Sequence, residues 1–180
     1  MKLKFIHTLG AAAVLTTALL AGPVQAQVVT GTIPVSLTLT SACTIGTVLF
    51  TSGSAAGSIT HDPMTFPSTP TTVTGDAATV TAHMSINYQC SAGSTPKLAF
   101  SGGTQPATPV RRMKHSAQSQ YIPYRLYRAT GGANEIPIDG TVDLSGTNIS
   151  ESVTIHGIAI IPANLNVGVY SDSVTVTLTL

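Results

Sequence analysis

The side chains that could do chemistry in this chain are few, and their spacing matches no common catalytic or metal-binding motif. Four histidines follow residue 26: His61, His83, His115 and His156. None has another histidine or a cysteine at zinc-motif spacing, so we interpret them as surface residues, with a metal site assembled in space as the alternative. Seven carboxylates are spread along the chain: Asp62, Asp76, Glu135, Asp139, Asp143, Glu151 and Asp172. No two of them stand out as a catalytic pair, and nucleophile-elbow and phosphate-loop motifs are absent, so we expect no enzyme, no cofactor and no metal.

The first 26 residues are typical of an export signal. Lys2 and Lys4 precede an apolar stretch over about residues 9–20, and Val24-Gln25-Ala26 fits the small-residue cleavage pattern. The apolar stretch is short for a membrane anchor, although an uncleaved anchor is the alternative. We therefore expect residues 1–26 to be a signal peptide and residues 27–180 to form a single exported domain.

The composition indicates a β-rich extracellular protein. Only 8% of the residues are charged, and there is no tryptophan. Without Lys2 and Lys4 the chain keeps six basic residues against seven acidic ones, so its formal net charge is −1. This balance gives no electrostatic reason to expect nucleic acid as a partner.

Two cysteines, Cys43 and Cys90, remain in the exported chain. An even pair in an oxidising compartment favours a disulfide, and closing this loop should stabilise the fold by about 3–4 kcal/mol. A redox or metal pair is the alternative, but neither cysteine has a CxxC partner or a histidine nearby.

Alternation of apolar and polar residues predicts about seven strands and no helix. The expected strands are residues 29–39, 48–50, 79–88, 97–100, 122–127, 152–161 and 173–180. Such strands, with turn residues between them, predict an all-β, immunoglobulin-like sandwich, with a small barrel as the alternative. Residues 51–74 and 104–119 are expected to be long loops. The second loop holds the basic run Arg111–His115, which we interpret as solvated, with an acidic-surface binding site as the alternative.

The two ends of the chain suggest a joint between molecules. The closing run 174–180 has neither a charge nor a proline to blunt a sheet edge, and an unpaired apolar edge is a template for another strand. The opening segment alternates in the same way. We expect the beginning of one chain to complete the end of another by strand addition, which gives an open head-to-tail filament.

Four stretches resemble the spore coat protein U family, which includes the archaic, Csu-type chaperone–usher pilins. They are VTGTIPVSLTLTSACTIG (29–46), INYQCSAG (86–93), RRMKHSAQSQYIPYRLYR (111–128) and NVGVYSDSVTVTLTL (166–180). The resemblance implies an incomplete immunoglobulin-like sandwich that is completed by a donor strand from a neighbouring subunit. It implies a donor segment at residues 27–40 and a pilin domain at residues 41–180.

The resemblance also implies roles for particular residues. The donor face would be Val29, Gly31, Ile33, Val35, Leu37 and Leu39. The acceptor edge would include Val174, Val176 and Leu178. Pro34 lies within the donor segment and cannot donate a ladder hydrogen bond, so the border between the donor and the subunit's own first strand is open.

The function implied is that of a structural subunit of a surface pilus or fimbria that supports adhesion and biofilm formation. Its partners would be a periplasmic chaperone, an outer-membrane usher and identical or related pilin subunits, and it would travel through the periplasm to the cell surface. The alternative is a self-complemented secreted coat or binding protein, whose opening segment folds into its own sheet.

Overall fold

The computed structural model describes residues 30–52, 61–72 and 78–180. The expected export signal and Val29 lie outside these residues. The chain divides into two units, one ending at Leu37 and the other running from Thr38 to Leu180. In the part of the chain that is described, no helix is long and apolar enough to cross a membrane.

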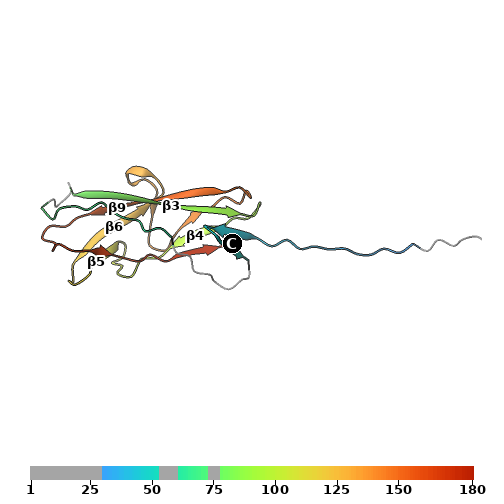
Figure 1. The fold of residues 1–180 in the computed structure, drawn as a ribbon, viewed down its shortest axis with the longest axis horizontal. Coiled ribbons are helices and arrows are strands. Elements are labelled where there is room, and N and C mark those ends of the chain that lie inside the picture. Colours follow the sequence, from blue (N-terminus) through green and yellow to red (C-terminus); the bar gives the residue numbers. More distant parts are fainter. Residues whose placement is uncertain (1–29, 53–60, 73–77) are drawn as a thin grey trace, which may run out of the picture. The chain divides into compact units, whose positions relative to one another are not determined.

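The unit that begins at Thr38 consists of two antiparallel sheets (Figure 1). The eight strands of the larger sheet run in the order β10-β5-β6-β9-β3-β1-β2, with β7 paired to β6. Their bounds are β1 Ala42–Ile45, β2 Val48–Thr51, β3 Thr79–Cys90, β5 Arg111–His115, β6 Tyr121–Tyr127, β7 Glu135–Ile136, β9 Glu151–Ile160 and β10 Tyr170–Ser171. The smaller sheet has the order β11-β4-β8, with bounds β4 Lys97–Phe100, β8 Gly140–Asp143 and β11 Val176–Thr179. The described residues also hold a short 3-10 helix, η1, at Thr130–Gly132.

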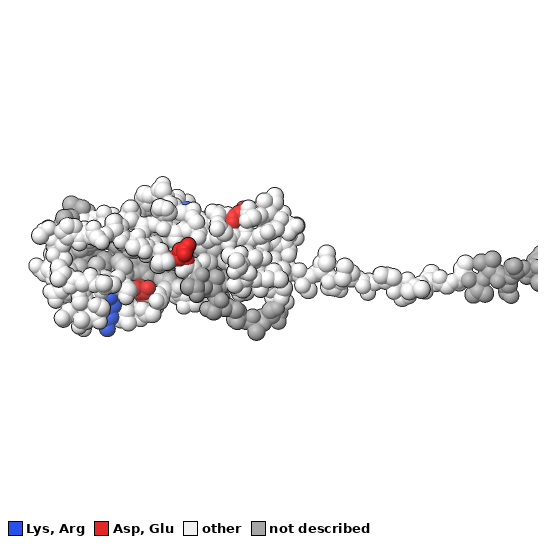
Figure 2. Space-filling view, in the orientation of Figure 1, with Lys and Arg blue, Asp and Glu red and all other residues white. Residues whose placement is uncertain are grey.

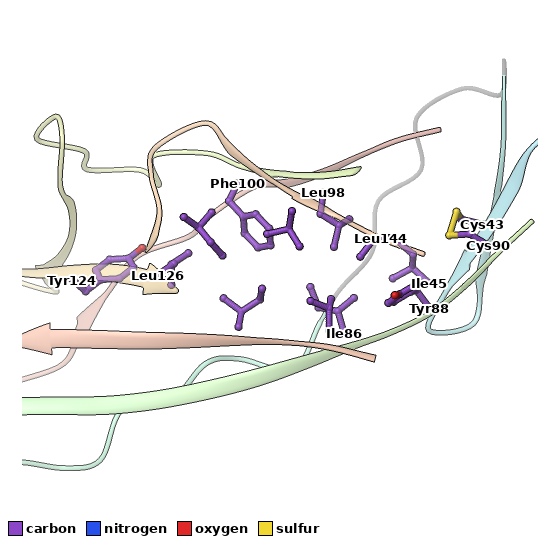
Figure 3. Packing of buried hydrophobic residues seen from close by; sticks show 14 of the residues in the cluster. Cys43, Ile45, Ile86, Tyr88, Cys90, Leu98, Phe100, Tyr124, Leu126 and Leu144 are labelled. Carbon is purple, nitrogen blue, oxygen red and sulfur yellow. A yellow bond between two sulfur atoms is a disulfide. The ribbon is translucent and has the colours of Figure 1, made fainter. Parts of the chain in front are cut away.

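The hydrophobic core lies between the two sheets (Figure 3). Its largest paired element is the β3–β9 ladder, which runs from Thr79 opposite Ile160 to Tyr88 opposite Glu151. Alternate residues of a strand point to opposite faces of the sheet, so one face of each strand supplies the core. Ile86 of β3 and Ile155 of β9 are almost completely buried on that face.

The disulfide Cys43–Cys90 joins β1 to β3 at one end of the core, as the sequence predicts (Figure 3). The two cysteines are direct cross-strand partners, and each is only 1% exposed. The disulfide therefore fixes the first strand of this unit to the central ladder.

The predicted all-β sandwich is confirmed, but the number and placement of its strands differ from expectation. The expected strands at residues 48–50, 79–88, 97–100, 122–127, 152–161 and 173–180 are present as β2, β3, β4, β6, β9 and β11. The strands β1, β7, β8 and β10 were not predicted, and the expectation of a strand at residues 29–39 was wrong for its described part, because residues 30–41 form none. The interpretation of residues 104–119 as one solvated loop was wrong, because Arg111–His115 forms β5. Arg111 is 2% exposed and His115 is 6% exposed, so His115 is not a surface histidine.

Removing the disulfide should destabilise the subunit by about 3–4 kcal/mol, because the unfolded chain regains the entropy of an open loop of 47 residues. The double variant Cys43→Ala/Cys90→Ala should show this loss in denaturant unfolding, when compared with the parent protein in oxidising buffer. Adding reductant should lower the stability of the parent toward that of the variant. Equal stability of parent and variant would show that the bridge contributes nothing.

Candidate functional site

Strand β11 lies at an edge of the smaller sheet. It pairs with β4 in antiparallel register, with Val176 opposite Phe100 and Thr179 opposite Lys97. Among the described residues no strand pairs with its other side. The expected acceptor edge is therefore the free side of this strand.

Backbone hydrogen bonds show which main-chain groups point toward that free side. The amide of Ser101 donates to the carbonyl of Thr175 at 2.9 Å, and the amide of Thr175 donates to the Ser101 hydroxyl at 2.8 Å. Thr175 thus directs its polar groups toward β4, and in an antiparallel ladder the direction alternates from residue to residue. It follows that Val176 and Leu178 direct their N–H and C=O groups away from β4, toward the open edge.

The side chains of this segment alternate in burial. Val174, Val176, Leu178 and Leu180 are partly buried and pack against the core, and the threonines between them are exposed. Residues 174–180 therefore combine main-chain groups that no described strand pairs with and an apolar row that the described residues cover incompletely. The predicted acceptor residues Val174, Val176 and Leu178 all lie in this row.

A hydrogen-bond network holds the chain just before β11. The Asp172 carboxylate accepts hydrogen bonds from the Tyr124 hydroxyl at 2.6 Å, and from the Thr104 amide and hydroxyl, each at 2.7 Å. Burial of Tyr124, together with the adjacent carboxylate, raises the pKa of the phenol, which therefore stays protonated and donates. The segment between β10 and β11 is thereby anchored to β6.

The buried side chain of Arg111 in β5 links the larger sheet to the smaller sheet by hydrogen bonds. Its guanidinium donates to the carbonyls of Ser101, Phe100, Ile136 and Pro137 at distances of 2.8–2.9 Å. Burial lowers the pKa of Arg111, and these carbonyls offset part of the cost of desolvating the charge. Because two of the carbonyls belong to the end of β4 and its continuation, Arg111 fixes the strand against which β11 pairs.

His115 holds the segment before β10. Its Nδ1 accepts hydrogen bonds from the amides of Ala117 and Gln118, so we assign the proton to Nε2, which lies 3.1 Å from the carbonyl of Val167. A Cβ atom at Gly168 would collide with this ring, which is why a glycine is needed there. The sequence placed Arg111 and His115 only in a basic run, and their buried roles depend on carbonyls from other strands.

The predicted donor residues are exposed wherever the structure describes them. Residues 30–41 form no strand, and Ile33, Val35, Leu37 and Leu39 are 84–90% exposed. Gly31 has no other group near the position of a Cβ atom. The alternating apolar face therefore exists in the sequence of this segment without a partner in the described structure.

Comparison with models of protein families shows which family the chain belongs to. The model of the Spore Coat Protein U domain matches residues 29–177, and the chain belongs to that family. A comparison with curated protein sequences finds no match.

Solved structures resemble this chain at low sequence identity. One is a chain of the CsuC–CsuE chaperone–tip adhesion subunit pre-assembly complex from the archaic chaperone–usher Csu pili of Acinetobacter baumannii, with 15% identity and a TM-score of 0.50. That match covers 79% of this chain and 41% of that chain. Another, from a chaperone–tip adhesin complex of CFA/I fimbriae biogenesis, has 13% identity, covers 66% and 38% of the two chains and has a TM-score of 0.43. This chain thus spans about two fifths of the length of the structures it matches.

The anchor between Tyr124 and Asp172 can be tested by removing one hydroxyl. Tyr124→Phe should lower the free energy of unfolding by about 1–3 kcal/mol, because a partly buried carboxylate loses a donor. Tyr121→Phe is the matched control, since the Tyr121 ring contacts Arg112 through its face and keeps that contact without its hydroxyl. Equal unfolding midpoints for the two variants in urea would contradict the anchoring role of Tyr124.

Proposed function

We propose that the chain is a structural subunit of a surface pilus or fimbria, assembled head to tail by donor-strand exchange. The observation that carries the proposal is the open edge of β11, with Val176 and Leu178 directing main-chain groups outward beside an incompletely covered core. The donor segment, residues 27–40 of one copy, would add a strand to residues 174–180 of the next. The fibre would support adhesion and biofilm formation at the cell surface.

The donor segment and the open edge of β11 have complementary chemistry. The donor segment offers Ile33, Val35 and Leu37 at alternate positions, and burying each such side chain contributes roughly 1.5–3 kcal/mol. The unpaired main-chain groups of Val176 and Leu178 would gain ladder hydrogen bonds. Together these terms are large enough to offset the entropy of association and to leave a slowly dissociating joint.

The open edge of β11 is also the reason for proposing a chaperone and an usher as partners. Before assembly, a periplasmic chaperone would cover β11 with a strand of its own, because an exposed apolar edge invites aggregation. An outer-membrane usher would then exchange that strand for the donor segment of the incoming subunit. Membership of the family and the shared fold support this sequence of events.

Pro34 and Gly31 restrict how the donor segment can pair with β11. Pro34 has no N–H to donate, so its nitrogen should face away from the β11 edge or lie where the donor strand ends. Gly31 lacks a side chain at a position of the apolar face, and we propose that it sits where the acceptor surface leaves no room for one. Ala42 begins the first strand that the subunit forms within its own sheet.

A charge on the apolar face of the donor segment should abolish polymerisation. Ile33→Asp would bury a carboxylate in the joint, whereas Thr32→Asp changes the neighbouring residue on the opposite face and should leave polymers intact. The readout is the ladder of heat-sensitive polymers on a denaturing gel, run with unboiled and boiled samples. Binding of the chaperone to both variants would show that each subunit folds.

Three results would count against the proposal. The first is a normal ladder from Ile33→Asp, and the second is equal loss in both variants. The third is an Ile33→Asp monomer that unfolds, since a donor segment used by another copy contributes nothing to the stability of its own subunit. This third result would favour the self-complemented coat or binding protein.

A further inference from the structure

Two histidines face each other on the outer side of the larger sheet. His83 of β3 and His156 of β9 are direct cross-strand partners, and their ring centroids are 6.1 Å apart. Val80, Met84 and Ile86 of β3 face the core, so the odd-numbered residues of this strand, including His83, project from the opposite face. The histidine pair is therefore separate from the apolar row of residues 174–180.

The pair lines a depression of about 580 Å³, and four of the other lining residues carry hydroxyl groups: Thr81, Ser85, Thr130 and Thr154. Ser85 and Thr154 are the next cross-strand pair on the same face of the ladder, and their hydroxyl oxygens are 3.1 Å apart. Thr130 and Gly131 of η1 form another wall. Such hydroxyls can donate to or accept from water molecules that a bound ion would hold.

The charges around the pair do not oppose a cation. In the row across the sheet, His156 is paired with Tyr127 of β6, and Tyr127 with Glu135 of β7. Arg125 lies on the same face, but its guanidinium is bound to the Glu135 carboxylate at 2.5 Å. The Arg125 charge is therefore already paired with a carboxylate.

The two rings are also free to act as ligands. Within the described residues neither imidazole of the pair makes a hydrogen bond, in contrast to His115, which uses both ring nitrogens. Two imidazoles on one ion, with metal–nitrogen distances of about 2.1 Å, place their ring centroids roughly 5–6 Å apart. A small rotation of the two side chains would bring the observed pair into that range.

We propose that His83 and His156 bind one divalent late first-row transition-metal ion, such as Zn²⁺, Ni²⁺ or Cu²⁺. Imidazole nitrogen suits these ions, and Cu²⁺ should bind most tightly of the three. The described residues contain no cluster of three or more histidine, cysteine or acidic side chains, so the remaining coordination positions belong to water. The site is a two-histidine chelate on the face of the sheet.

Titration with Zn²⁺ alone, followed by calorimetry on the folded mature protein, tests the proposal. One ion per chain should bind at pH 7.5, and His83→Asn or His156→Asn should each weaken binding by about tenfold or more, because the chelate is lost. His61→Asn is the matched control and should bind as the parent does.

Cu²⁺ supplies an independent readout. The electron paramagnetic resonance spectrum of the protein with one equivalent of Cu²⁺ should show coupling to two imidazole nitrogens, reduced to one in either variant. The absence of saturable Zn²⁺ binding would overturn the proposal, as would unchanged affinity in His83→Asn. These measurements do not depend on pilus assembly, and all three histidine variants should still form polymers. Failure of the metal-site proposal and failure of the proposed function can therefore be distinguished.

Discussion

Within the part of the chain that the structure describes, strand β11 is paired on one side only, and the proposed assembly depends on this open edge. Main-chain N–H and C=O groups need partners, and a flat row of unpaired groups beside apolar side chains is a template for a further strand. Residues 174–180 present such a row, because Thr175 bonds to β4 while Val176 and Leu178 point the other way. Among the described residues the core behind them is only partly covered, and we propose that a strand from another copy completes the sandwich.

The rest of the subunit keeps this edge in one place. Arg111 fixes the end of β4 through backbone carbonyls, and Asp172 ties the start of the closing segment to Tyr124. The disulfide secures the first strand to the central ladder at one end of the core. Only 8% of the residues are charged, and the face in Figure 2 shows only a few charged patches. In the proposed fibre, specificity of assembly would therefore rest on strand pairing and apolar fit more than on surface charge.

Several features could be predicted from the sequence because period-2 alternation records burial on one face of a strand. This rule found β3, β9 and the closing segment, but it also predicted a strand at residues 29–39, of which the described part forms none. It failed for β5, where Arg-Arg-Met-Lys-His reads as a solvated loop, because Arg111 is stabilised by carbonyls that only the folded sheets bring together. It also could not pair His83 with His156, since the register between β3 and β9 is set by the whole ladder rather than by either segment.

Hydrogen exchange of the amides in residues 30–37 tests the central claim most directly. Measured by mass spectrometry, these amides should exchange rapidly in the chaperone-bound subunit and become strongly protected in the assembled fibre, because they would then pair with β11 of a neighbouring copy. Rapid exchange in the fibre would show that this segment does not form the joint. Protection in an isolated, dilute monomer would show that the segment completes its own subunit, and would contradict donor-strand exchange between copies.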